Sequence, residues 1–368
     1  MRRVIQRLHL IVASIAGVFL VVLGITGAIM AFEPELDHLL HWRLWHVTPA
    51  GLPLSLAQLG ATAARAVPGA HISGYILSSS PDLSWQVLLG GRVAYINQYT
   101  GDVLGVVPNG PDFLSRVHQL HLRLLWQSPS DAGKTVMSWS GLALVGLVIS
   151  GFYLWWPQKR VRVRRGGSGA RAWLDVHHAT GALSLAFLLL LAVTGVCIGF
   201  DRQLVPLAYQ LTGTAPQLVY GQTPARRSTP TGDPMITPDD ALAAARAALP
   251  GAAPISINVP GPTGVYSISA RYPEDRTPGG RSRIVIDPDT GRVLAAEGSR
   301  TAPLGTRLVT LNRAIHTGDV FGLASKTVMS LASLAVVGQA VSGLIIWWAR
   351  RRPVAFTRPR GERTQPLR

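Results

Sequence analysis

Histidines are the residues of this sequence whose type and positions could support redox chemistry. His9 and His177 each open a long apolar stretch, and His121 and His316 precede two others. A neutral imidazole is a good axial ligand for haem iron. Ionisable residues near a membrane core are energetically costly, so their presence indicates a function. We therefore expect His9 with His177, and His121 with His316, to form two pairs that each hold one haem b.

Two of these ligand positions have a competitor nearby in the sequence. His178 directly follows His177, although the internal alignment favours His177. His118 lies one helical turn before His121, and the alignment of His121 with His316 needs a gap. His178 and His118 therefore remain the alternative ligands.

Other repeated side chains have two interpretations each. Lys134 and Lys326 begin apolar stretches, where they would either pair with haem propionates or anchor the membrane interface. Met137 and Met329 also repeat, but a methionine on a membrane helix usually packs against its neighbours. We expect packing for the methionines and keep both interpretations for the lysines.

The histidines need elements that bring them together, and an internal repeat supplies these. Residues 134–156 and 326–348 share a Lys-Thr-Val-Met-Ser start, a Ser-Gly pair and a final Trp-Trp. The stretches opened by His9 and His177 both contain Thr-Gly near their ends. Each stretch is long enough to cross a bilayer, which needs about 20 apolar residues. Such self-similarity predicts a duplicated membrane unit, whose quasi-two-fold axis would place each histidine pair across the bundle centre.

Small residues lie close to the predicted ligands along the chain. Ala13 follows His9 by one helical turn, and Gly181 follows His177 in the same way. These positions would leave room for a flat macrocycle. The repeated Ser-Gly pairs are typical of close packing between membrane helices.

The composition is that of a membrane protein. Hydrophobic residues make up 48% of the chain and charged residues 15%, against about 25% charged residues in soluble domains. The net charge of +16 is concentrated in residues 1–8, 157–172 and 350–368, which flank the apolar stretches. This is the positive-inside pattern. It places both termini in the cytoplasm and excludes nucleic-acid binding as the reason for the charge.

Several classes of site are excluded by missing motifs. The single cysteine, Cys197, allows no intrachain disulfide, and no Cys-x-x-Cys-His motif for covalent haem attachment occurs. No Gly-x-Gly-x-x-Gly or Walker A pattern indicates a nucleotide-binding domain. A His-Glu-x-x-His metal-hydrolase motif and an acidic relay of the kind that proton-coupled transporters use are also absent from the apolar stretches.

The chain divides into spans and outside regions. In each outside region, a helix closed by Pro-Gly precedes short strands with Gly-containing turns, at about 54–107 and 236–297. The expected segments are a first span at 10–32, an outside region at 33–113, a histidine-bearing segment at 114–133, a second span at 134–156, a basic cytoplasmic loop at 157–172, a third span at 177–200, a second outside region at 201–306, a second histidine-bearing segment at 307–325, a fourth span at 326–348 and a cytoplasmic tail at 349–368.

Four motifs occur together over almost the whole chain. The first motif is ALAAARAALPG followed by IDPDTGRVL, and the second is AQLGATAARAVPG followed by YINQYTGDVLG. The third is a span that opens with histidine and contains Thr-Gly near its end, and the fourth is the ending Ser-Gly-x-x-x-Trp-Trp. Their combination resembles the PepSY-associated transmembrane family. The resemblance implies a mainly α, four-helix transmembrane bundle of the bacterial inner membrane, built from two repeats that each carry an extracytoplasmic α+β PepSY-like domain. It also implies a likeness to di-haem reductases of ferric siderophores such as ferrioxamine.

The histidine pairs and the resemblance lead to one main functional expectation. The protein would carry electrons through two haem b groups to ferric siderophores in the periplasm and release Fe(II). A cytoplasmic reductase or a membrane quinol would supply the electrons, and no catalytic side chain beyond the haem is required. One alternative is a non-enzymatic protein whose PepSY-like domains bind and regulate a periplasmic partner. Another is electron transfer to a different acceptor, such as a flavin or a sulfur oxyanion.

Overall fold

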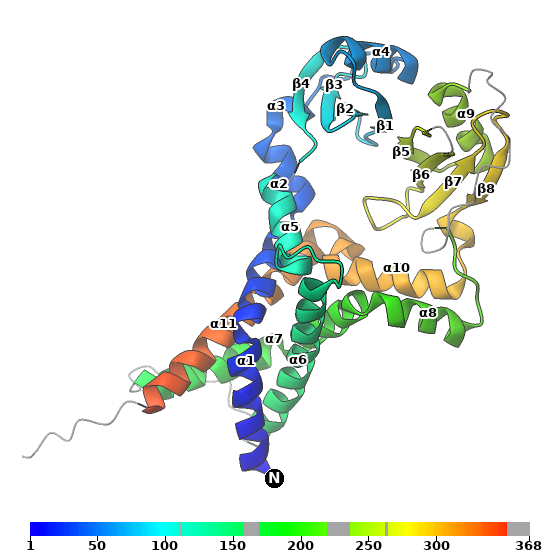
Figure 1. The fold of residues 1–368 in the computed structure, drawn as a ribbon. Helices are drawn as coiled ribbons and strands as arrows, with labels where there is room; N and C mark the ends of the chain where they lie inside the picture. The colour runs from blue at the N-terminus through cyan, green and yellow to red at the C-terminus, as the bar shows by residue number, and fades with distance from the viewer. Residues whose placement is uncertain (111, 158–168, 219–235, 262–263, 352–368) are drawn as a thin grey trace, which may run out of the picture.

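The computed structural model describes residues 1–110, 112–157, 169–218, 236–261 and 264–351. A bundle of long helices forms one end of the molecule, and a β-sheet with two covering helices forms the other (Figure 1). We call the end of the bundle nearer the sheet the sheet end, and the opposite end the far end. The N-terminus lies at the far end (Figure 1).

Four helices within the described residues are long and apolar enough to cross a membrane. A helix satisfies its backbone hydrogen bonds within one segment, as hydrocarbon requires. The shortest has 24 residues and is therefore about 36 Å long at 1.5 Å per residue, against about 30 Å of hydrocarbon. The four are α1 (Arg2–Met30), α6 (Ala132–Trp155), α7 (Gly169–Gly199) and α11 (Leu323–Arg351).

The helix ends differ from the limits of the apolar stretches. For example, α7 begins at Gly169, well before the expected residue 177. Hydropathy marks only the apolar part of a helix, whereas backbone hydrogen bonding continues into the polar turns beside it. Most of the expected basic loop (157–172) and tail (349–368) falls outside the described residues.

Within the bundle, α1 and α7 each pack against both α6 and α11. A buried apolar layer joins the four helices near the middle of their length. Because lipid tails are as apolar as these side chains, close packing holds membrane helices together more than water exclusion does. The buried members of the layer are Ala16, Leu20, Val148, Leu188 and Val336.

Two glycines allow close crossings between the long helices. A Cβ on Gly24 of α1 would lie 2.6 Å from the backbone oxygen of Ser333 in α11. A Cβ on Gly199 of α7 would lie 2.7 Å from Oγ of Ser138 in α6. Any larger residue would force the helices apart, so both positions are small-residue contacts of the kind that membrane helices use.

Among the described residues, five short α-helices lie between the bundle and the sheet. α5 packs against α1 and α6, whereas α10 packs against α7 and α8. α8 and α10 run side by side at the sheet end of the bundle (Figure 1). The five are α2 (Glu33–Leu40), α3 (Trp42–Trp45), α5 (Phe113–Arg123), α8 (Asp201–Thr212) and α10 (Leu304–Thr317).

The strands form one antiparallel sheet in the order β4-β3-β2-β1-β5-β6-β7-β8. Four strands come from the residues before 157, which we call the first half of the chain, and four from those after 169, the second half. The strands are β1 (Ile72–Ile76), β2 (Trp85–Leu89), β3 (Arg92–Ile96), β4 (Val103–Pro108), β5 (Ala253–Asn258), β6 (Tyr266–Arg271), β7 (Ser282–Ile286) and β8 (Val293–Glu297).

The two outside regions meet at the pairing of β1 with β5. Gly74 lies opposite Asn258 in this pair. A Cβ on Gly74 would approach the backbone oxygen of Ile257 to 2.7 Å, so only glycine fits there. The sequence predicts a domain in each outside region, at about 54–107 and 236–297, and the structure places the strands of both regions in one sheet. Pairing between strands so distant along the chain depends on the tertiary fold and leaves no local sequence signal.

Two helices, α4 (Leu56–Ala66) and α9 (Pro238–Ala248), share a buried apolar core with the strands of both halves. Each begins with a capping box, formed by Ser55 with Gln58 and by Thr237 with Asp240. Such caps satisfy backbone N–H groups that the first turn of a helix leaves without partners. The same local signals thus start both helices.

Asp239 joins these two helices directly. Its carboxylate accepts hydrogen bonds from the backbone N–H of Leu56 at 2.7 Å and of Ala57 at 2.9 Å. A carboxylate at a helix N-terminus is favourable because the helix dipole is positive there. The second half of the chain therefore completes the N-terminus of a helix in the first half.

Candidate functional site

At the far end of the bundle, two histidines contact serines on neighbouring helices. His9 Nδ1 in α1 lies 2.8 Å from Ser150 Oγ in α6. His177 Nδ1 in α7 lies 2.8 Å from Ser342 Oγ in α11. Both serine hydroxyls donate to a backbone oxygen one turn earlier, at 2.7 and 2.6 Å. A hydroxyl has only one proton to donate, so each serine accepts its second hydrogen bond from the imidazole Nδ1–H.

The same arrangement recurs at the sheet end with threonines. His121 Nδ1 in α5 lies 2.8 Å from Thr26 Oγ1 in α1. His316 Nδ1 in α10 lies 3.0 Å from Thr194 Oγ1 in α7. These threonines also donate to backbone oxygens of their own helices, at 2.6 and 2.7 Å. They therefore also accept from Nδ1–H.

These contacts fix the tautomer of all four imidazoles. A neutral imidazole with its proton on Nδ1 has an unprotonated Nε2, which is the form that binds a metal. Hydrogen bonds to the other ring nitrogen are the usual means of orienting a metal-binding histidine. The described residues contain no group of three or more His, Cys, Asp or Glu that could hold a bare ion. Histidines in pairs suit an iron whose remaining ligands come from a macrocycle.

A glycine follows each of the four hydroxyl residues and lies beside the imidazole. At the far end, a Cβ on Gly151 would lie 3.5 Å from Cε1 of its histidine, and one on Gly343 3.7 Å. At the sheet end, the corresponding distances are 3.2 Å for Gly27 and 3.0 Å for Gly195. Hydroxyl and glycine thus act together, the first holding the ring and the second leaving space for it. Sequence reasoning interpreted the Ser-Gly pairs only as helix-packing positions and missed this role.

Open space lies next to the far-end site. Gly146 and Gly338 are exposed, and a Cβ on either would have no heavy atom within 4 Å. They precede Ser150 and Ser342 by one turn, so they share a helix face with the residues that hold the histidines. A flat group could lie against this face. The residues present therefore fit a macrocycle at the far end.

The room expected beside Gly181 is occupied in this structure. A Cβ on Gly181 would lie 3.2 Å from Oε1 of Gln339 in α11. The Gln339 amide donates to the backbone oxygen of His177 at 3.2 Å and to Thr180 Oγ1 at 2.6 Å. The spacing of small residues predicted free space here, but an amide from another helix fills it.

We call His9 and His177 the far-end level, and His121 and His316 the sheet-end level. The two levels lie far apart along the bundle. The stretch of α1 from His9 to Thr26 is about 25 Å long at 1.5 Å per residue, and the stretch of α7 from His177 to Thr194 has the same length. The buried apolar layer of the four helices lies between them. The site therefore consists of one level near each end of the bundle, with an apolar region between.

Burial keeps the sheet-end histidines neutral. It lowers the pKa of His121 to about 3, and the nearby His316 and His118 add to this effect. Burial also lowers the pKa of His316 to about 4. Both rings are therefore uncharged at neutral pH, as a metal ligand must be.

The structure separates the predicted ligands from their competitors. His118 Nδ1 lies 3.0 Å from Glu33 Oε2, and about a third of each side chain is exposed. The contact with Ser342 is made by His177, and the ring of His178 lies 6.4 Å away from that of His177. The geometry thus favours His121 and His177 over their neighbours.

The two repeated lysines form ion pairs between the halves of the chain. Lys134 Nζ lies 2.7 Å from Asp201 Oδ1, and the buried Lys326 Nζ lies 2.6 Å from Glu35 Oε1. Lys326 is also 3.8 Å from Asp319. Each lysine therefore has a carboxylate partner that follows the first long helix of the other half. Pairing with haem propionates stays a prediction.

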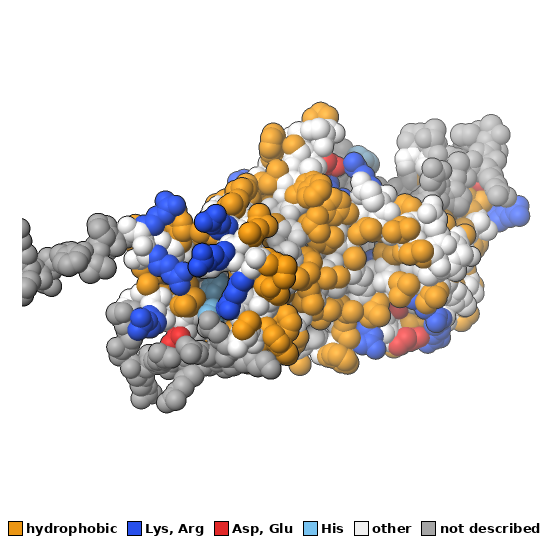
Figure 2. Space-filling view, turned by 90° about the horizontal axis from the view of Figure 1, so that it is seen from below, with side chains coloured by type: hydrophobic (Ala, Val, Ile, Leu, Met, Phe, Trp, Pro, Cys, Tyr) orange, Lys and Arg blue, Asp and Glu red, His pale blue; other side chains and the backbone are white. Residues whose placement is uncertain are grey.

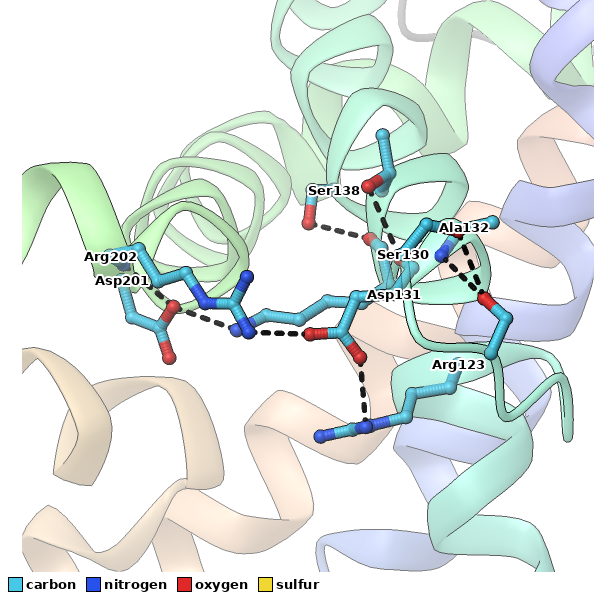
Figure 3. Close-up of polar contacts among 10 residues, drawn as sticks. Arg123, Ser130, Asp131, Ala132, Ser138, Asp201 and Arg202 are labelled. Atoms are coloured by element: carbon cyan, nitrogen blue, oxygen red, sulfur yellow. Dashed lines mark hydrogen bonds and ion pairs between the residues drawn. The ribbon is translucent and has the colours of Figure 1, made fainter.

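Asp131 lies at the centre of a charged network that the sequence gave no reason to expect. Its two carboxylate oxygens accept from Arg123 at 3.0 Å and from Arg202 at 2.7 Å (Figure 3). The neighbouring Asp201 accepts a hydrogen bond from Lys134 Nζ at 2.7 Å. The network joins α5, α6 and α8, and so fixes the sheet-end helix α5 that carries one of the histidines.

Other histidines and the repeated methionines lie outside the two histidine sites. His41 Nδ1 is 2.7 Å from Asp37 Oδ1, and His46 stacks on Trp42 with ring centroids 3.3 Å apart. These residues belong to α2, α3 and the turn that follows, where α3 packs against β3 and β4. Met137 and Met329 are buried within the bundle.

Basic side chains gather at the far end of the molecule, around exposed apolar side chains of the helices (Figure 2). They come from the first turns of α1 and α7 and from the last turn of α11. The exposed basic residues of these turns are Arg2, Arg3, Arg7, Arg171, Arg350 and Arg351. The far end thus carries a positive surface beside the apolar helices.

Four membrane-length apolar helices make this chain a multi-pass membrane protein. The family model of the PepSY-associated TM region matches residues 6–350. The chain therefore belongs to the PepSY-associated transmembrane family. The matched region contains all four histidines of the two levels and their hydroxyl partners. A comparison with curated proteins gives no match.

Proposed function

We propose that this protein carries electrons across the bacterial inner membrane through two haem b groups and reduces ferric siderophores outside. One observation supports the proposal above all others. Four histidines, two near each end of the bundle, are held through Nδ1–H by a hydroxyl of another helix. That arrangement leaves every Nε2 able to bind iron.

His9 and His177 would hold one haem, and His121 and His316 the other. When bound, each haem iron would supply a one-electron redox centre whose potential depends on its ligands and surroundings. The chain orients the imidazoles through the four hydroxyls and gives them space through the four glycines. The similar order of elements in the two halves supports a duplicated unit, with one histidine of each level from each half.

The charges support an orientation for the protein in the membrane. Basic side chains gather at the far end (Figure 2), and Lys and Arg are enriched in cytoplasmic segments of membrane proteins. The far end and both termini would then face the cytoplasm, and the sheet would face the periplasm. The sheet-end histidine level would lie near the outside substrate, and the far-end level near the electron donor.

The bundle can separate electron movement from solute movement. A layer of buried apolar side chains lies between the two histidine levels, and an ion at that depth would meet a large desolvation cost. Electrons need no aqueous path, but about 30 Å of hydrocarbon is too long for one efficient step. Two histidine levels on either side of the apolar layer would divide the distance.

The reaction would be a one-electron reduction of each ferric ion. A quinol that gives up two electrons and two protons would reduce two ferric chelates, and a separate cytoplasmic reductase is the alternative donor. Fe(II) binds hard-oxygen chelators more weakly than Fe(III) does, so reduction would release the metal. The chain would contribute binding, orientation and electrostatics, and no separate catalytic side chain is required.

The proposal can be tested with the detergent-purified protein under anaerobic conditions. The protein is reduced with dithionite, freed of excess reductant and mixed with a ferric siderophore and a coloured Fe(II) trap. We expect b-type absorbance that reoxidises as the trap binds Fe(II), at one Fe(II) per electron stored. A protein that contains haem but is not reoxidised by any ferric chelate would contradict siderophore reduction. A protein without b-type absorbance would favour a binding or regulatory role for the sheet.

A further inference from the structure

A cavity outside the histidine site lies between the loop that follows β6 and the helix α10. It has a volume of about 180 Å³. Three arginines, Arg276, Arg281 and Arg307, contribute to its lining. The lining extends along α10 as far as Ala314, two residues before His316. The cavity therefore adjoins the helix that carries a sheet-end ligand.

Two hydroxyls of this cavity lack partners. Thr277 is only 4% exposed, and its Oγ1 has no hydrogen-bond partner among the residues that the structure describes. The same holds, within those residues, for the buried Oγ of Ser299. Buried polar groups are almost always hydrogen-bonded, because an unpaired one keeps the cost of losing water. These hydroxyls indicate that a ligand with hydrogen-bond acceptors belongs in the cavity.

Arg276 and Arg307 each make a hydrogen bond to a backbone oxygen and have further donors. Arg276 Nη1 donates to the backbone oxygen of Val320 at 2.8 Å, and Arg307 Nη2 donates to that of Arg300 at 3.2 Å. A guanidinium has five N–H donors. One backbone hydrogen bond therefore positions the group and leaves further donors for a ligand.

The carboxylates of the lining do not cancel its positive charge. Glu274 forms an ion pair with Arg300 at 2.6 Å. Asp275 accepts a hydrogen bond from the backbone N–H of Tyr272 at 3.0 Å. Among the remaining charged side chains of the lining, the guanidinium groups of Arg276 and Arg307 outnumber the carboxylate of Asp275. The cavity therefore favours an anion.

We propose that this cavity binds a carboxylate group of an anionic, citrate-type ferric chelate. The proposal rests on the proposed function and narrows its substrate class. Arginine binds carboxylates through paired, charge-assisted hydrogen bonds, and the unpartnered hydroxyls can donate to the same oxygens. One carboxylate-bearing arm fills the cavity, and the chelated iron is held next to α10. A cationic trihydroxamate chelate is disfavoured, because its charge has the same sign as that of the lining.

Equilibrium binding to the full-length protein in detergent tests the proposal without any electron transfer. Calorimetry with citrate and with ferric citrate should show saturable binding at one site. Arg307→Gln should weaken it about 10- to 100-fold, as expected for loss of a hydrogen bond to a charged group. Thr277→Val should weaken it about tenfold, and Arg292→Gln, a change of an exposed arginine that does not line the cavity, should leave it unchanged.

Visible spectra of the same samples separate this inference from the proposed function. Variants that keep the wild-type haem spectrum are folded, so a loss of citrate binding in them supports the cavity. Unchanged binding in both cavity variants, no binding by the wild type, or equal competition by a cationic trihydroxamate chelate would overturn the inference. Citrate binding to a protein that proves free of haem would support an anion site while removing the proposed reductase function.

Discussion

Both levels pair a histidine with a hydroxyl residue of another helix, but α1 and α7 carry the histidine at one level and the hydroxyl at the other. At the far end, α1 and α7 carry the histidines, and α6 and α11 carry the hydroxyls. At the sheet end, α1 and α7 carry the hydroxyls, and the short helices α5 and α10 carry the histidines. Two helices thus contribute to both levels, so the separation between the levels is set by their length. A rigid spacing is useful if electrons must pass from one level to the other.

The levels differ in how closely the imidazoles are enclosed. The sheet-end glycines lie nearer to their rings than the far-end glycines do, and the far end has open space beside Gly146 and Gly338. The sheet-end histidines also lie on helices that do not span the bundle, and one of these helices, α10, lines the cavity proposed to bind a carboxylate. We infer that the imidazoles of the sheet-end level have less space beside them than those of the far-end level. The following predictions test this difference.

The largest expected effect comes from removing a hydroxyl at either level. Thr194→Val at the sheet end and Ser342→Ala at the far end each delete the acceptor of one Nδ1–H. Loss of such an orienting partner typically weakens metal binding by about 10- to 100-fold. Haem transfer to apomyoglobin should show one haem leaving faster in each variant. Ser184→Ala is the control, because that serine bonds only to its own helix; equal haem retention in all three variants would contradict the assigned role.

A smaller effect should distinguish the levels sterically. In Gly195→Ala, the new Cβ would lie 3.0 Å from His316 Cε1, so the ring must shift. In Gly343→Ala, the distance to His177 Cε1 is 3.7 Å, an ordinary contact. A strained side chain costs about 0.5–1.5 kcal/mol, so Gly195→Ala should weaken haem retention by up to about tenfold, whereas Gly343→Ala should not. Equal sensitivity of the two variants would remove the difference between the levels.

The smallest effect concerns the ion pairs between the halves. Lys326 is buried beside Glu35 and Asp319, whereas Lys134 is more exposed. Lys326→Met should lower the free energy of unfolding by about 1 kcal/mol, the upper end for an ion pair with a half-exposed partner such as Glu35. Lys134→Met should lower the free energy of unfolding by only about 0.3 kcal/mol, as expected for a more exposed ion pair. Thermal unfolding followed by tryptophan fluorescence measures both; a larger loss for Lys134→Met would show that burial does not set the order.

Much of this architecture could be predicted from local sequence signals. Apolar stretches of membrane length predict the four long helices, and the Pro-Gly endings predict the two helices of the sheet. The repeat also selected His9, His177, His121 and His316, because equivalent positions in two halves single out four histidines among ten. The pairing of each level across the bundle followed from the expected symmetry.

The remaining features depend on contacts between distant segments. A Ser-Gly pair on a membrane helix is explained by packing alone, and only the fold shows that Ser150 lies against His9. Other Ser-Gly and Thr-Gly pairs occur in the long helices, such as Ser140-Gly141 and Thr180-Gly181, so the motif alone does not single out the four that hold the histidines. The pairing of β1 with β5 and the reach of Asp239 to α4 also join residues far apart in the chain. No periodicity or local motif encodes such contacts.

The central claim is that two haem groups are held at two separate levels by these histidines. A pyridine haemochrome count on the purified protein, together with His9→Ala and His121→Ala, tests it most directly. We predict two haem b per chain in the wild type and one in each variant. A wild-type protein without haem, or variants that both keep the wild-type count, would contradict the claim.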